Sequence, residues 1–155
     1  MIETVDGKHY NTTMPIMRAL SDELGRYKAS DQDAAYFSEA VIDLANDWHA
    51  EWTRKYFASE ELRRDYLENG SVRHAKHMDV IYAHYEGPYA AGHEHTYRSH
   101  SPIFLSQMIY QDKARERLQE MPNLQRFVEA MESRPNLKEY LHEINTNVPK
   151  VHALD

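Results

Sequence analysis

The chain has 155 residues, of which 41% are hydrophobic and 28% charged, a length and composition typical of one globular domain. Its 18 Lys and Arg stand against 25 Asp and Glu, and the resulting net charge of −7 repels a phosphate backbone, so we expect no nucleic-acid partner. Cysteine is absent, which excludes disulfides and thiolate chemistry in this chain, and no apolar run approaches the roughly 18 residues of a membrane span.

The first predicted element is a β-hairpin within residues 3–12. Asp6 and Gly7 separate two short runs that favour strands, and this pair is a strong signal for a two-residue turn because glycine accepts a positive φ. A two-stranded hairpin is marginally stable and has open backbone edges. We therefore expect a protein partner, or a second copy of the chain, to cover the hairpin edge.

Two helices are predicted next. The first runs from about Met14 to Leu24 and is closed by Gly25. The second has Ser30 as its N-cap, with Asp33 three residues further on. Behind this cap, six apolar residues recur at helical spacing over about five turns: Ala34, Phe37, Val41, Leu44, Trp48 and Trp52.

The remainder of the chain is also typical of helices. The charged residues 60–68 either extend the long helix or begin a loop, and Asn69 with Gly70 marks their end. A helix is predicted over residues 72–85, and a surface loop over residues 91–100. Three more helices are predicted to begin near Ser101, Pro122 and Pro135. The fold class is therefore mainly α, a helical bundle preceded by a β-hairpin.

Histidines are the first candidates for chemistry. His93 and His95 flank one residue, and His100 follows in the same predicted loop, so their imidazole nitrogens are weak candidates for a metal site. Earlier in the chain, His74 and His77 are three residues apart and share a helical face. Without a fixed third ligand, surface histidines are the simpler interpretation, and a metal-binding helical protein remains the more distant hypothesis.

Acidic residues are the second candidates. Glu39, Asp43 and Asp47 recur every four residues along the predicted long helix. Paired carboxylates do general acid–base work where a cleft perturbs their pKa values. The same spacing is more often the solvated face of an amphipathic helix.

Longer segments of the chain carry a recognisable pattern. VDGKHYNTTMPIMRAL (residues 5–20) joins a hairpin to a helix, and MPNLQRFVEAMESRPNLKEYL (residues 121–141) joins two helices that begin with proline. The first segment resembles the end of the thioredoxin-like domain of cytosolic glutathione transferases, and the second resembles the end of their helical domain. Between them, LGRY (residues 24–27) and DQDAA (residues 31–35) are similar to the linker and first long helix of mu-, pi- or sigma-like members.

The resemblance implies a division into two parts. Residues 1–26 would be a remnant of the thioredoxin-like domain, a β-hairpin plus a helix, and residues 27–155 a glutathione-transferase C-terminal-like all-α domain. It also implies that the first β-α-β part is missing, together with the catalytic Tyr or Ser that holds the glutathione thiol. We therefore expect no catalytic residue and no cofactor in this chain.

The same resemblance implies candidate contacts to glutathione, as a ligand or substrate. Thr13 matches a serine that holds the γ-glutamyl carboxylate at a helix N-terminus, and Thr12 matches the glutamine before it. Glu39 falls where related proteins place an acid that reaches the amine of glutathione in the neighbouring subunit. Thr13 is equally well explained as a plain N-cap.

Two functions follow as expectations. The first is a non-catalytic structural or binding subunit of a larger assembly, in the cytoplasm or inside an organelle such as the mitochondrion. The alternative is a glutathione transferase that conjugates glutathione to electrophiles and is completed by another chain or by a dimer partner.

Overall fold

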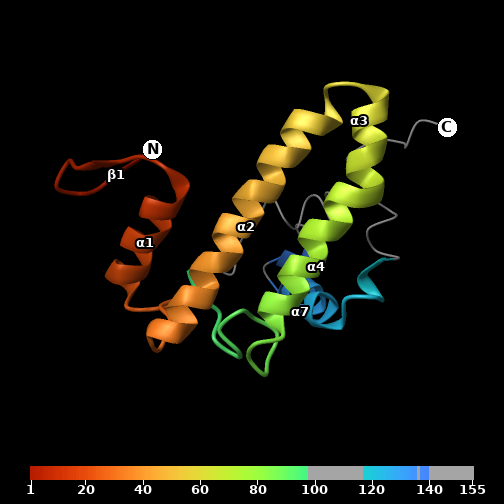
Figure 1. Cartoon of the computed structure of the whole chain (residues 1–155). Helices are drawn as coiled ribbons and strands as arrows, with labels where there is room; N and C mark the ends of the chain where they lie inside the picture. Colours follow the sequence, from red (N-terminus) through yellow and green to blue (C-terminus); the bar gives the residue numbers. More distant parts are fainter. Residues whose placement is uncertain (98–116, 136, 140–155) are drawn as a thin grey trace.

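A long helix, α2 (Gln32–Tyr56), runs antiparallel to a second helical column that returns beside it. The computed structural model describes residues 1–97, 117–135 and 137–139. The returning column contains α3 (Glu60–Asp65), the π-helix η1 (Tyr66–Gly70) and α4 (Ser71–Tyr82), and α7 (Pro122–Glu132) packs against α4 (Figure 1). The predicted mainly α bundle after a short hairpin is confirmed.

The hairpin forms, but with a longer turn than predicted. Strands β1 (Ile2–Glu3) and β2 (His9–Tyr10) pair antiparallel. The Thr4 carbonyl accepts from the Gly7 N–H, and the Thr4 N–H donates to the Lys8 carbonyl, so three residues rather than two make the turn. Gly7 has a φ of 77°, which supplies the left-handed residue that such a turn requires.

Helix α1 (Thr13–Leu24) has the predicted bounds, and Gly25 closes it with a φ of 59°. Its apolar stripe is only partly buried. Leu20 and Leu24 are 43% and 59% exposed. Helix α1 lies beside the first half of α2, and the hairpin extends away from the bundle on the same side (Figure 1).

The long helix α2 confirms the predicted stripe and corrects its cap. Asp31, not Ser30, is the N-cap, because an Asp31 Oδ1 atom accepts from the Ala34 N–H over 2.8 Å. Val41 and Trp48 are buried in the core, as the spacing requires. Glu51 is buried on the same helix, which the pattern did not predict.

The predicted stop at Asn69 and Gly70 is wrong. The chain leaves α2, begins α3 with Ser59 as N-cap, and passes through η1 directly into α4 without ending the helical column. Gly70 has helical dihedral angles here, so its sequence signal for a helix end is overridden by tertiary packing. The column is what brings α4 against α2.

The core lies between α2, α4 and α7. In α7, the predicted stripe is buried as expected: Leu124, Phe127, Val128 and Met131. Asp79 of α4 caps this helix from outside, because its carboxylate accepts from the backbone N–H groups of Asn123 and Leu124, each over 2.9 Å. Pro122 occupies the first turn, as predicted.

The predicted surface loop is partly internal. Within its described part, Ala91, Thr96 and Tyr97 are buried. The helix predicted near Ser101 lies outside the described residues, as does most of the helix predicted from Pro135. In the part of the chain that the structure describes, no helix combines the length and apolar character needed to traverse a membrane.

Candidate functional site

The start of α1 is the first candidate site. Thr12 is the N-cap residue with a φ of 73°, and its side chain makes no capping hydrogen bond. Thr12 and Thr13 are both exposed, and no acidic residue occupies the first turn. A helix N-terminus of this kind offers backbone N–H groups to an anion. The geometry is compatible with the carboxylate-binding role that the resemblance implies for Thr13.

Glu39 lies on the exposed side of α2 and approaches α1 through Arg18. The Arg18 Nη2 atom is 3.8 Å from Glu39 Oε1, and both side chains are more than half exposed. This contact places Glu39 against the middle of α1, because Arg18 is more than one turn beyond Thr13. Asp43 and Asp47 are exposed on the same helix, in agreement with a solvated face.

Arg18 makes a second contact that the sequence reasoning missed. Its Nε–H donates to the Tyr97 hydroxyl over 3.0 Å, and this bond is the main reason that the pKa of Arg18 is raised. The Tyr97 N–H in turn donates to the Tyr27 carbonyl over 2.9 Å. The sequence signal for this contact was Arg18 itself, a charged residue next to the apolar stripe of α1, since such a residue often has a partner elsewhere in the fold.

The histidine candidates do not converge. His93 is exposed, whereas His95 is half-buried with its ring against the edges of Tyr27 and Tyr89. His100 lies outside the described residues. Within residues 1–97, 117–135 and 137–139, no group of three or more potential ligands is arranged to hold a metal ion.

An ionic cluster around one buried carboxylate joins α2 to α4. The carboxylate of Glu51 is 8% exposed and binds His74 Nε2 over 2.8 Å, Lys55 Nζ over 3.0 Å and the guanidinium of Arg73. Lys55 also binds Asp65 over 2.8 Å. We call these five residues the Glu51 cluster. His77, which shares a predicted face with His74, is exposed and takes no part in the cluster.

The electrostatics of Glu51 follow from its neighbours. Burial raises the pKa of Glu51, but hydrogen bonds from His74 and Lys55 and the charge of Arg73 outweigh it and lower the pKa to about 2. Because Glu51 is ionised, His74 Nε2 is the donor in their hydrogen bond. A carboxylate with this many donors is a poor proton acceptor, so the cluster is suited to holding helices together.

Gly70 and an aromatic pair complete the surroundings of Glu51. A Cβ atom on Gly70 would lie 3.0 Å from both Glu51 Oε1 and Tyr66 Cδ2. The Trp48 indole N–H donates to the Tyr66 hydroxyl over 2.6 Å, and the Trp48 ring stacks with His74 at 5.8 Å. The sequence signal for this buried site was Glu51 itself, which lies three residues after Trp48 on the apolar stripe of the helix.

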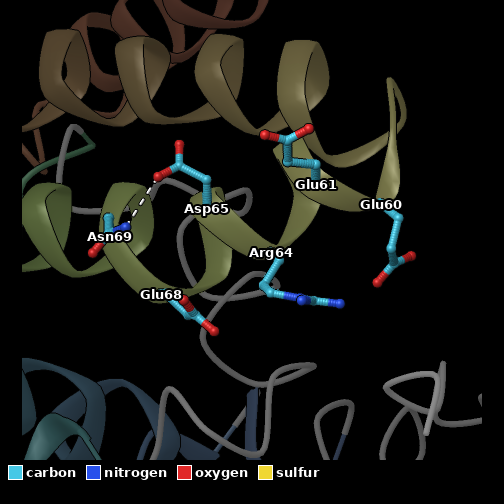
Figure 2. Close-up of a pocket in the computed structure, with 6 residues that line it drawn as sticks. All are labelled: Glu60, Glu61, Arg64, Asp65, Glu68 and Asn69. Carbon is cyan, nitrogen blue, oxygen red and sulfur yellow. Dashed lines mark hydrogen bonds between the residues drawn. The ribbon is translucent and has the colours of Figure 1, made fainter.

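A depression of about 440 Å³ lies along α3 and η1. Figure 2 shows the side chains around it and the hydrogen bond from Asn69 to Asp65. Its walls are mainly acidic, with one guanidinium: Glu60, Glu61, Arg64, Asp65, Glu68 and Asn69. None of the candidate residues from the sequence lies here, and the excess of carboxylates disfavours an anionic ligand.

Comparison with known proteins identifies part of the chain. A family model described as "Glutathione S-transferase, C-terminal domain" matches residues 46–143. A search of curated proteins found no significant match, and neither did a search of solved structures. The matched range includes the second half of α2, the Glu51 cluster, α4 and α7.

Proposed function

Because the chain belongs to the family of glutathione S-transferase C-terminal domains, we propose that it is a non-catalytic structural or binding subunit of a larger assembly. In this proposal, residues 1–26 correspond to the end of a thioredoxin-like domain of a mu-, pi- or sigma-like transferase. We name the hairpin and α1, residues 1–24, the arm. The proposed task of the arm is to contact a protein partner or a second copy of the chain.

The observation that carries the proposal is the exposed apolar surface of the arm. Leu20, Leu24 and Val5 are all exposed, although α1 has an apolar stripe typical of a packed helix. The described sheet has two strands, and a sheet of this size needs further strands or a covering element for stability. Burial of the two leucines in an interface would contribute about 1 to 2 kcal/mol each.

The chemistry of the tyrosines favours binding over catalysis. A transferase must stabilise the thiolate of glutathione, which requires a hydroxyl or cation open to the substrate. Burial raises the pKa of Tyr66 and Tyr82, and it is the main cause of the raised pKa of Tyr85. The pKa shifts of these three tyrosines are in the direction opposite to that of an activated hydroxyl.

The alternative function is a glutathione transferase that another chain or a dimer partner completes. It is favoured by the open N-terminus of α1, where Thr13 could hold a carboxylate, and by the exposure of Glu39 on the adjacent helix. In this alternative the chain supplies part of the glutathione site, and the partner supplies the thiol-activating group.

Size and binding measurements on the purified full chain test the proposal. We expect sedimentation or cross-linking to show a homo-oligomer or a stoichiometric complex, and the combined variant Leu20→Glu and Leu24→Glu to abolish it. Val80→Glu, on the exposed side of α4, is the matched control and should leave the assembly intact. A monodisperse monomer without a partner would contradict the proposal.

Enzyme assays separate the two functions. The proposed subunit does not turn over a chloronitrobenzene substrate with glutathione, alone or in its assembly. Turnover by the assembly that falls on Thr13→Ala, but not on Thr53→Ala of α2, would establish the alternative instead. Both threonines are exposed and helical, so the control removes the same hydroxyl at an unrelated place.

A further inference from the structure

The arm lies outside the hydrophobic core of the described part of the bundle. In the described part of the molecule, the hydrophobic core cluster begins at Val41 and includes no residue of the hairpin or of α1. An element outside the core is held by individual hydrogen bonds and ion pairs, whose loss does not require the core to open.

Tyr97 contacts both the arm and the segment that connects it to α2. Its hydroxyl accepts from Arg18 in the middle of α1, over 3.0 Å, and its backbone N–H donates to the carbonyl of Tyr27, over 2.9 Å. The Tyr97 side chain is buried, so both bonds are shielded from water at one end. Glu94, from the same loop, accepts from the Ser30 N–H over 2.9 Å. Two of these bonds are made to residues 25–30, which connect α1 to α2, and the third is made to α1 itself.

The connecting segment is held in a conformation that it would not favour alone. Tyr27 has a φ of 65°, in the left-handed region that favours glycine and that is strained for a bulky residue. Its carbonyl is bound by Tyr97, and its ring contacts the edge of His95 at 5.9 Å. The tertiary contacts therefore maintain the strained turn, and loss of them would let residues 25–30 relax.

We propose that Arg18, Tyr27 and Tyr97 form a clasp that fixes the direction of the arm relative to the bundle, and that its opening releases the arm as a unit. The biological role of the clasp rests on the proposed function. In that role, the clasp pre-organises Leu20 and Leu24 of the arm for binding to the partner. A partner that binds the fixed arm does not have to order it, so opening of the clasp weakens the assembly.

Amide hydrogen exchange of the isolated full chain tests the clasp without any partner. Tyr97→Phe removes one hydroxyl, and Arg18→Gln removes the charged donor. Each is expected to speed exchange of amides in residues 13–30 about tenfold, with exchange in α4 and α7 unchanged. The combined variant should exchange no faster than Arg18→Gln alone, because Arg18→Gln already removes the bond to the Tyr97 hydroxyl together with the contact to Glu39.

The controls make the same chemical changes elsewhere. Tyr36→Phe and Arg54→Gln alter exposed residues of α2 and should leave exchange in residues 13–30 as in the parent chain. Unchanged exchange of this segment in both clasp variants would overturn the proposal. Equal acceleration in α4 and α7 would also overturn it, since that result would mean global destabilisation.

A distance measurement gives a second readout. The chain has no cysteine, so Val5→Cys and Val80→Cys can carry two spin labels, one on the arm and one on α4. We expect a single narrow distance distribution in the parent and a broader one when Tyr97→Phe is added. A broad distribution in the parent would refute the clasp. If the faster exchange and the broader distance distribution are both observed but no partner is found, the proposed function is excluded and the clasp is retained.

Discussion

Glu51 of α2 and His74 of α4 meet inside the bundle, where the His74 Nε2–H donates to a Glu51 carboxylate oxygen over 2.8 Å. Both side chains are more than 90% buried. A buried carboxylate is retained only when its desolvation is offset by donors, and here those donors come from both helices. The pair therefore ties together the two longest elements of the described core.

Removal of the Glu51 carboxylate should destabilise the bundle. Glu51→Ala leaves His74 without its acceptor and the cations of Lys55 and Arg73 without their shared anion. Arg73 is more than half exposed and can be rehydrated, so we expect a loss of about 2 kcal/mol in the free energy of unfolding. Urea denaturation measures it. Glu68→Ala on the surface of η1 is the control and should change stability by less than about 0.5 kcal/mol.

The stability of the chain should fall in acid partly because of Glu51. Burial raises its pKa, but hydrogen bonds from His74 and Lys55 predominate and lower it from the ordinary 4.5 to about 2. The contribution is therefore fully present above about pH 4.5 and is lost as the pH falls toward about 2. Urea denaturation over this range should show a shallower acid loss in Glu51→Gln than in the parent. Parallel curves would contradict the assignment.

Gly70 should not tolerate a branched side chain. A Cβ atom added to Gly70 would lie only 3.0 Å from Glu51 Oε1 and Tyr66 Cδ2, so the larger side chain of Gly70→Val would force the Glu51 cluster apart. We expect a loss of about 2 kcal/mol or more, despite the better helix propensity of valine. Thermal unfolding compares this variant with Glu68→Val in the same π-helix. A Gly70→Val chain as stable as its parent would show that the cluster can move aside.

Asp79 should contribute more to stability than an exposed acid. Its carboxylate accepts from the N–H groups of Asn123 and Leu124 and from the Asn123 amide side chain, and so caps α7 from another helix. We expect Asp79→Ala to cost about 2 kcal/mol, at the upper end for a helix cap. Hydrogen exchange should show the loss first in α7. Asp43→Ala, on the exposed side of α2, is the matched control and should leave α7 protected.

The helices were predictable where burial repeats along one element. The stripes of α2 and α7 give their inner faces directly, because an amphipathic helix has one apolar side and periodicity reports it. Gly25 and Pro122 likewise mark helix ends by their own backbone preferences. The family resemblance of the helical domain agrees with the matched range at residues 46–143.

The candidate site residues remain predictions. Thr13 is at an open helix N-terminus, and Glu39 is beside α1, and the role of each depends on a ligand or partner. The histidine loop could be judged only from the fold, which turns the ring of His95 toward Tyr27 and Tyr89 and leaves His93 exposed.

The sequence by itself determined the mainly α class, the inner faces of its helices and the position of the hairpin, because these depend on local preferences and on spacing along one element. Only the tertiary structure decided that Gly70 continues a helix, that Glu51 is buried, and that Tyr97 reaches Arg18. Each of these depends on groups distant in the chain, and a polar residue shows its partner only after packing has removed water from both.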